Sequence, residues 1–273
     1  MAQRLMVAAV GIPLLLLVFL WLPAIWLVVM FAALAVVAVH ELLWSTGFVK
    51  HVRITGYSCI AAGLLPFYFY YFAGNEKLLL CGVFAYMVLI FGEALASHYK
   101  VTFEMLGIAI FAALVVPYFF SAFIRIRLGE GELGIYYILL PLVSAFGSDS
   151  FALFAGMLCG KHKLAPELSP KKTVEGAIGG LLGAVAFCLI YGLVIDLGFA
   201  MQVDYFALSI YGIFGSGISQ MGDLSFSYIK RQSGLKDYGT IFPGHGGVPD
   251  RFDSVIFCAP LTELLIWLLP AFT

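Results

Sequence analysis

The chain has 273 residues, of which 62% are hydrophobic and only 11% are charged, and its formal net charge is −1. Soluble domains contain roughly 45–50% apolar and about 25% charged residues, so this composition excludes an ordinary soluble domain. It predicts that lipid is the solvent for much of the chain. The net charge identifies no partner, and we predict no nucleic-acid binding.

The N-terminal stretch resembles a secretion signal, because Arg4 precedes a long apolar run. No small-residue cleavage site follows it, and a second apolar run begins directly after Pro23. We therefore interpret this stretch as a retained first membrane span.

Nine apolar runs along the chain are long enough to cross a bilayer, which takes about 20 residues of helix. They are continuous rather than alternating, which favours helices over a β-barrel. The sequence thus predicts an all-α integral membrane protein, a polytopic bundle of about nine transmembrane helices. We divide it into an N-terminal region, 1–125, with spans 1–5 and a C-terminal region, 126–273, with spans 6–9. The predicted spans are approximately 5–22, 24–44, 56–73, 78–95, 105–124, 134–157, 176–199, 205–226 and 252–271.

The distribution of lysine and arginine predicts the orientation of these spans. The N-terminus and the loops after spans 2, 4, 6 and 8 hold 12 of the 15 basic residues. Cytosolic loops are enriched in basic residues, so we predict a cytosolic N-terminus in a cell membrane. The 12 residues are Arg4, Lys50, Arg53, Lys100, Lys161, Lys163, Lys171, Lys172, Lys230, Arg231, Lys236 and Arg251.

Two predicted cytosolic loops, 158–175 and 227–252, differ from the other loops. With the residues that border them they contain eight basic residues, two of the five histidines and many of the acids. We predict that these loops fold together and that function lies where they meet. In the adjoining spans, small residues such as Gly179 and Gly183 predict close helix packing.

Two aspartates lie inside apolar runs, Asp149 in the sixth and Asp223 near the cytosolic end of the eighth. A carboxylate at the centre of a membrane helix costs about 2.5–3.5 kcal/mol on insertion scales, so it normally faces a polar cavity and a partner. We interpret both as functional; the alternative is a structural hydrogen bond between helices. We interpret His40-Glu41, Glu93 and His98, at the ends of spans 2 and 4, as structural interface residues. For Glu93 and His98 the alternative is a place at the border of the polar cavity.

The run HGGVPDRFD, 245–253, combines residue types that suit phosphate chemistry. Gly246 and Gly247 allow close backbone approach, and their amides are candidate phosphate donors. Asp250 and Asp253 are three residues apart at a helix start, so they share a face beside Arg251. Such carboxylates suit Mg²⁺ held together with substrate phosphates. The alternative interpretation is a helix cap with a solvated ion pair, and His245 alone is a weak indication.

Basic residues follow spans 6 and 8 directly, among them Lys171, Lys172, Lys230, Arg231 and Lys236. The positive-inside pattern and attraction to anionic lipids explain their number. They do not explain the glycines, acids and histidine between them, a mixture that phosphate recognition requires.

The run 227–253 resembles the motif of the phosphatidate cytidylyltransferases, also called CDP-diacylglycerol synthases. The resemblance includes Ser227, Lys230-Arg231, Lys236-Asp237, Gly239, Pro243, His245-Gly246-Gly247, Asp250-Arg251 and Asp253. An earlier stretch, SDSFALFAGMLCGKHKLAPELSPKKTVEG, is similar to a second motif of the family. These motifs cover about the last half of the chain, and the N-terminal spans match in hydropathy alone.

The resemblance implies an Mg²⁺-dependent transfer of CMP from CTP to phosphatidic acid, with pyrophosphate as the second product. It makes the C-terminal region catalytic, and the distribution of basic residues places that site on the cytosolic side. It implies metal ligands Asp223 and Asp250, with a second cation left open, and it makes a homodimer plausible. The implied catalytic residues are Asp250, Asp223, Arg251, Lys172 and Asp253, and the implied substrate-binding residues are Lys230, Arg231, Lys236, His245, Gly246, Gly247, Lys171 and Asp149.

Two alternatives remain open on the sequence. The acceptor lipid is not specified, because apolar walls would select it, so an ether-lipid phosphate or a polyprenol is an alternative substrate. An anion transporter is the alternative from another class, since intramembrane acids and glycine-rich helices also mark transport paths. The missing inverted repeat and the one-sided charge argue against transport.

Overall fold

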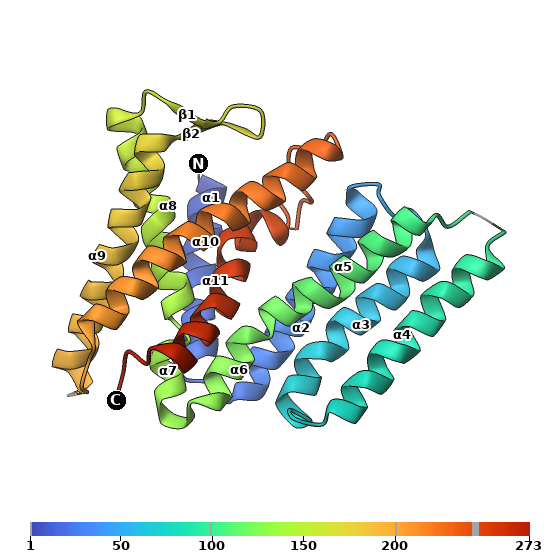
Figure 1. The fold of residues 1–273 in the computed structure, drawn as a ribbon, viewed down its shortest axis with the longest axis horizontal. Coiled ribbons are helices and arrows are strands. Elements are labelled where there is room, and N and C mark those ends of the chain that lie inside the picture. Colours follow the sequence, from blue (N-terminus) through green and yellow to red (C-terminus); the bar gives the residue numbers. More distant parts are fainter. Residues whose placement is uncertain (1, 99, 200, 242–245) are drawn as a thin grey trace. The chain divides into compact units, whose positions relative to one another are not determined.

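The computed structural model describes residues 2–98, 100–199, 201–241 and 246–273. Its chain packs as two compact units, which we describe separately: unit 1 is Met1–Leu128 with Gln232–Arg251, and unit 2 is Gly129–Arg231 with Phe252–Thr273. Each of the nine predicted spans corresponds to a long helix (Figure 1). The prediction of an all-α, polytopic membrane protein is confirmed.

Five helical stretches among the described residues are long and apolar enough, by length and composition, to cross a membrane. Their outward-facing side chains include many large apolar residues; Leu80, for example, is 69% exposed and Leu95 is 86% exposed. Such surfaces are expected where hydrocarbon replaces water as solvent. The five stretches are Ala24–Ser45, Glu76–Ala96, Phe103–Gly129, Gly131–Cys159 and Val174–Phe199.

Unit 1 is built mainly from the N-terminal helices, with α2, α3 and α5 packed on one another and α4 beside α3 (Figure 1). Phe31 stacks on Phe123 at 4.7 Å between ring centroids, and Phe19 and Phe120 join this aromatic core. Its helices are α1 Ala2–Leu20, α2 Ala24–His40, the π-helical turn η1 Glu41–Ser45, α3 Val52–Tyr71, α4 Glu76–Ala96, α5 Phe103–Phe120 and most of α6 Ala122–Gly129.

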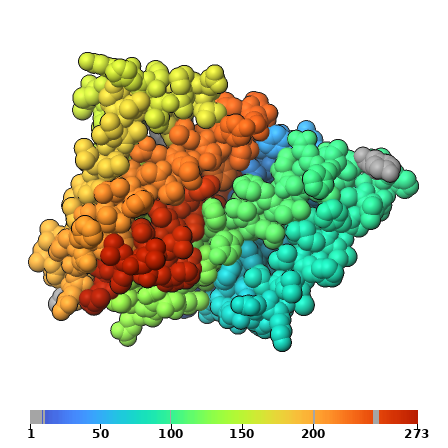
Figure 2. All heavy atoms as spheres, in the orientation of Figure 1, coloured from blue at the N-terminus to red at the C-terminus, as the bar shows by residue number. Residues whose placement is uncertain are grey.

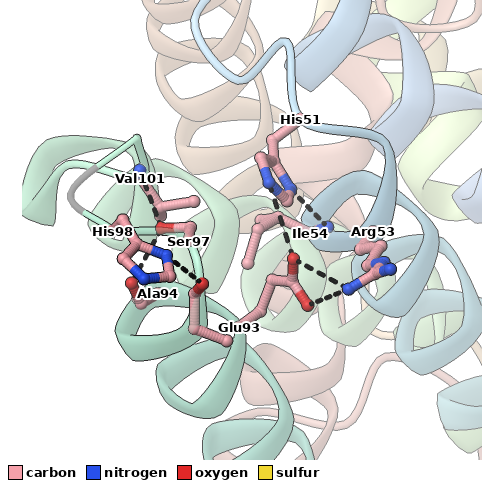
Figure 3. Close-up of polar contacts among 9 residues, drawn as sticks. His51, Arg53, Ile54, Glu93, Ala94, Ser97, His98 and Val101 are labelled. Atoms are coloured by element: carbon pink, nitrogen blue, oxygen red, sulfur yellow. Dashed lines mark hydrogen bonds and ion pairs between the residues drawn. The ribbon is translucent and has the colours of Figure 1, made fainter.

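The start of α3 and the end of α4 are joined by a polar cluster (Figure 3). Glu93 lies 3.3 Å from the Arg53 guanidinium and 3.6 Å from His51 Nε2, and His51 Nδ1 caps the amide of Ile54. These contacts agree with the structural interpretation of Glu93.

Unit 2 contains most of the C-terminal helices and one β-hairpin, which the sequence did not predict. The two strands pair antiparallel, with Lys163 opposite Thr173 and Ala165 opposite Ser169, and the hairpin projects at one end of α8 and α9 (Figures 1 and 2). Its elements are η2 Gly131–Leu133, α7 Gly134–Tyr137, α8 Leu140–Cys159, β1 Lys163–Ala165, β2 Ser169–Thr173, α9 Val174–Phe199, α10 Tyr205–Gln232 and α11 Pro249–Leu268, of which Gln232 and Pro249–Arg251 belong to unit 1.

Small residues bring the helices of unit 2 into close contact, as predicted. A Cβ on Gly179 would overlap Ala155 of α8, and one on Gly183 would overlap Phe151. Gly212 of α10 lies against the backbone of Val185 in α9 in the same way. The close approach of α8, α9 and α10 sets the position of the polar side chains on them.

Candidate active site

Five charged side chains of unit 2 form an acid–base cluster. The Lys172 ammonium lies 2.5 Å from Asp223 Oδ2, with the two side chains 25% and 28% exposed. Asp149 interacts electrostatically with Asp223 and Lys172, and Asp253 interacts with Asp149, Asp223 and Lys230. The acid–base cluster is therefore Asp149, Lys172, Asp223, Lys230 and Asp253, from α8, β2, α10 and α11.

Packing next to each acid places it in this cluster. Ser148, adjacent to Asp149, bonds to Ser216 of α10 across 2.8 Å. Gly222, adjacent to Asp223, lies against the backbone of Asp253, where a Cβ would overlap the carbonyl oxygen. Hydroxyl groups complete the shell, since Ser227 donates to Asp223 at 3.3 Å and Ser254 hydrogen-bonds to Asp149.

The acid–base cluster borders a cavity of about 600 Å³ within unit 2. Its polar lining comes from Asp149, Lys171, Lys172, Thr173, Gln220 and Asp223, and its remaining walls are apolar or glycine. Leu153 and Met157 of α8 form part of the apolar wall and are 61% and 65% exposed. The cavity thus combines charged groups with an apolar surface on a membrane helix.

The hairpin that presents Lys171 and Lys172 is anchored at both ends. Glu175, in the first turn of α9, accepts hydrogen bonds from the amides of Lys161 and His162, and pairs with the His162 ring at 2.7 Å. Arg231, in the last turn of α10, donates from Nε to the carbonyl of Leu168 at 3.2 Å. Arg231 was predicted to bind substrate, and here its Nε holds the hairpin turn.

The second motif lies in unit 1, where Asp250 organises the segment before α11. Asp250 is buried, and its Oδ2 accepts hydrogen bonds from the amides of Tyr238 at 2.7 Å and Gly247 at 2.9 Å. Gly246 adopts φ +89°, a conformation that favours glycine. The Gly247 amide, predicted as a phosphate donor, is thus bonded to Asp250.

The remaining predicted residues differ in their surroundings. Lys236 and Arg251 are exposed, and His245 lies outside the described residues. Lys230 and Arg231 belong to α10, which continues to Gln232, whereas the predicted span ends at 226. The loops 158–175 and 227–252, predicted to fold together, meet in part within unit 2, where Arg231 bonds to Leu168. For the rest of the second loop, which belongs mainly to unit 1, the meeting stays a prediction.

Two residues near these groups were not predicted as site residues. Gln220 lines the cavity and donates to the carbonyl of Ala177 at 3.1 Å and to Ser216 at 3.0 Å. A glutamine in an apolar run is a signal of the kind that identified Asp149 and Asp223. Glu41 is buried and accepts a hydrogen bond from the amide of Val248 in unit 1, whereas its sequence position indicated an interface residue.

The donor set of the acid–base cluster suits Mg²⁺ bound together with phosphates. Asp149, Asp223 and Asp253 offer hard carboxylate oxygens, and Mg²⁺ usually takes one or two protein carboxylates with substrate phosphates and water. Within the described ranges, no group of three or more His, Cys, Asp or Glu side chains is arranged to hold an ion by protein groups alone.

Comparison with known proteins places the chain in a family. The model of the cytidylyltransferase family matches residues 2–269. The phosphatidate cytidylyltransferase of Bacillus subtilis is 37% identical over 204 residues, 74% of each chain. Those of Staphylococcus epidermidis and Staphylococcus aureus are 32% and 33% identical over 235 and 240 residues, 85% of this chain and 86% of theirs. The chain belongs to the cytidylyltransferase family and is a CTP-using nucleotidyltransferase of the membrane.

Proposed function

We propose that the protein transfers CMP from CTP to phosphatidic acid, which gives CDP-diacylglycerol and pyrophosphate. Three relatives with 32–37% identity bear the name of this activity. The structural observation that supports it is the cavity of unit 2, which joins the acid–base cluster to an apolar wall. A lipid phosphate likewise joins a charged head group to apolar chains.

The apolar wall favours a lipid as the acceptor. Leu153, Met157 and Leu164 line the cavity beside Lys171 and Lys172. Acyl chains can lie along the exposed side chains of α8 while the phosphate reaches the lysines, which bind it as point charges. Burying the chains away from water favours this orientation.

The residues of the acid–base cluster suit a direct displacement. A phosphate oxygen of the lipid attacks the α-phosphorus of CTP, a new P–O bond forms, and the bond to the β-phosphate oxygen breaks. Its electron pair leaves with pyrophosphate, so no protein nucleophile is required. Both reactants are anions, so Lys172 and Lys230 lower their repulsion, and catalysis is mostly positioning and electrostatic stabilisation.

We propose that Asp223 binds Mg²⁺ together with substrate phosphates, with Asp149 and Asp253 as neighbouring oxygen donors. When bound, the ion neutralises charge on the phosphates and on the leaving pyrophosphate. Asp250 was predicted as the second ligand, and the Asp250→Asn variant would test that assignment. Lys172 holds Asp223 in place until phosphates bind, because the two side chains are already paired.

A radiolabelled CTP assay in detergent micelles tests this proposal. We expect pyrophosphate release and labelled lipid with phosphatidic acid and Mg²⁺, and neither product without the lipid or with chelator. Parallel arms with an ether-lipid phosphate and a polyprenol compare acceptors. Preferred turnover of either one would overturn the choice of phosphatidic acid. CTP uptake into sealed proteoliposomes without pyrophosphate release would overturn the reaction.

We further propose that the site faces the cytosol, on the basis of the basic-residue distribution. In the variants Lys171→Cys and Lys236→Cys, the introduced thiol should react with an impermeant thiol reagent in inverted vesicles. It should stay protected in sealed right-side-out vesicles. The reverse pattern would contradict this orientation. We also expect a homodimer, which native mass spectrometry of the detergent-solubilised protein checks against a monomer.

A further inference from the structure

Glu41 occupies an unusual position at the end of the second membrane span. The α2 helix ends at His40, and the chain continues as the π-helical turn η1, of which Glu41 is the first residue. Single π-helical turns occur frequently at functional sites. The Glu41 side chain is only 4% exposed, so a carboxylate is buried directly after the long apolar run of α2.

The carboxylate of Glu41 contacts a distant part of unit 1. Its Oε2 accepts a hydrogen bond of 2.7 Å from the amide of Val248, 207 residues later in the chain. A Cβ added to Gly239 or to Gly247 would overlap the same carboxylate. Glu41 therefore fills a space that two glycines leave open and bonds the backbone next to one of them.

Asp250 bonds the same segment. Its Oδ2 takes the amides of Tyr238 and Gly247, so Glu41 and Asp250 together satisfy three backbone donors between 238 and 248. We call these two residues the two-acid clamp. They also repel each other electrostatically, and both are buried. Burial of two acids is unfavourable, so stability alone is a poor reason for this arrangement.

We propose that Glu41 is a positioning residue for the nucleotidyl transfer: through Val248 it fixes the backbone that leads into Asp250 and Arg251. The proposal deepens the proposed function and rests on it. Glu41 acts through the segment rather than on the substrate, so a residue of the N-terminal spans takes part in catalysis that the sequence assigned to the C-terminal region. A shift of about 1 Å in a positioned group can cost 10²-fold in rate.

The alternative is that Glu41 only stabilises unit 1. Ser58→Ala provides the matched control, because it removes another buried hydrogen bond of unit 1, the 2.9 Å bond between Ser58 and Tyr86. A stabilising role predicts that both variants lower the melting temperature and leave the turnover of the folded fraction unchanged. A positioning role predicts lost turnover only for the Glu41 variant.

The first experiment compares Glu41→Ala and Glu41→Gln with Ser58→Ala in the full-length protein. We expect kcat/KM for CTP to fall about tenfold or more in Glu41→Ala, and to be largely retained in Glu41→Gln, whose amide oxygen can accept from Val248. Hydrogen exchange of the 238–250 segment should accelerate about tenfold or more in Glu41→Ala, as expected for loss of a charge-assisted hydrogen bond. Ser58→Ala should change neither.

The second experiment is a double-mutant cycle on the contact with Gly239. Gly239→Ala should lower kcat/KM, because its Cβ meets the Glu41 carboxylate, and Glu41→Ala should offset part of that loss in the double variant. Gly92→Ala on α4 is the control, since nothing lies within 4 Å of a Cβ there. Additive losses in kcat/KM in the double variant would overturn the coupling between Gly239 and Glu41.

The outcomes separate this inference from the proposed function. If the wild-type protein releases no pyrophosphate from CTP, the proposed function fails, while hydrogen exchange still decides whether Glu41 orders the segment. If the wild type is active and folded Glu41→Ala keeps its kcat/KM within twofold, the positioning role is wrong. Should Glu41→Ala not fold, Glu41→Gln and the Gly239→Ala single variant still decide. Slow hydrogen exchange of the 238–250 segment in Glu41→Gln, together with a lowered kcat/KM in Gly239→Ala, supports the inference. An unchanged kcat/KM in Gly239→Ala overturns it.

Discussion

In the acid–base cluster of unit 2, Asp223 pairs with a lysine side chain and borders a cavity. In unit 1, Glu41 and Asp250 are buried and accept hydrogen bonds from backbone amides. The two regions therefore use the same functional group with different partners. Lysine can exchange its carboxylate for a substrate phosphate, whereas bonded amides fix the course of the chain.

The two kinds of partner suit different roles: under the proposed function, the acid–base cluster contacts the substrate, and Glu41 and Asp250 fix the backbone. A side-chain ion pair at 25–28% exposure can open when a phosphate enters. An acid bonded to backbone amides cannot release them without leaving buried donors unsatisfied, which costs about 1–3 kcal/mol each. Substitutions in the acid–base cluster should lower kcat/KM alone. Substitutions in the two-acid clamp should also speed up hydrogen exchange in the 238–250 segment.

Asp223→Asn should have the largest effect, a loss of about 10³–10⁴-fold in kcat/KM. The change removes a charge worth several kcal/mol to phosphates held with a metal ion, and each 1.36 kcal/mol corresponds to tenfold in rate. A radiolabelled CTP assay measures the loss, and the melting temperature checks that the variant is folded.

Asp196→Asn is the matched control for Asp223→Asn, because Asp196 accepts a hydrogen bond from Tyr205 near the other end of α9, away from the cavity lining. We expect its activity to stay close to wild type. Equal losses in the two variants would remove the special role of Asp223.

Asp250→Asn should lower turnover about 10³-fold while the protein stays folded. An asparagine oxygen can still accept from Tyr238 and Gly247, so the variant keeps the backbone contacts and loses the charge. The measurement is activity across a range of Mg²⁺ concentrations, with hydrogen exchange of the 238–250 segment. Near wild-type turnover at saturating Mg²⁺ would make the predicted metal role of Asp250 wrong and leave it a shaping role.

Lys172→Met should lower kcat/KM about 10²-fold, and Lys171→Met about tenfold. Both lysines line the cavity, but the structure pairs Lys172 with Asp223, so its loss also leaves that carboxylate without this cation. The measurement is kcat and KM for each substrate. Equal effects of the two variants would show that the ion pair adds nothing beyond positive charge.

Much of the fold followed from the sequence because hydrocarbon imposes a simple rule. Continuous apolar runs must be helical, and the nine predicted runs are long helices in the structure. Gly179 and Gly183 indicated close packing, which the structure shows against α8. The hairpin was missed because its strands, Lys163–Ala165 and Ser169–Thr173, are too short and too polar for a periodic pattern.

The candidate site was predicted only in part. Asp149 and Asp223 were identifiable, because an acid in an apolar run is costly and needs a partner. The extension of α10 to Gln232 was missed, since its last residues are polar. The sequence indicated an interface residue at Glu41 and missed its contact, because its partner, Val248, is 207 residues away and no local pattern encodes such a contact.

The smallest expected effect concerns the support of the acid–base cluster by the hairpin. Glu175→Gln weakens the pair with His162 and the bonds to the amides of Lys161 and His162, all exposed to solvent. Because exposed pairs contribute little, we expect at most about a fivefold loss in kcat/KM, which is greater at low salt. Glu167→Gln, an exposed acid in the hairpin turn, is the control and should be neutral. A loss as large as that of Lys172→Met would show that the hairpin position, rather than the charge on Lys172, limits the reaction.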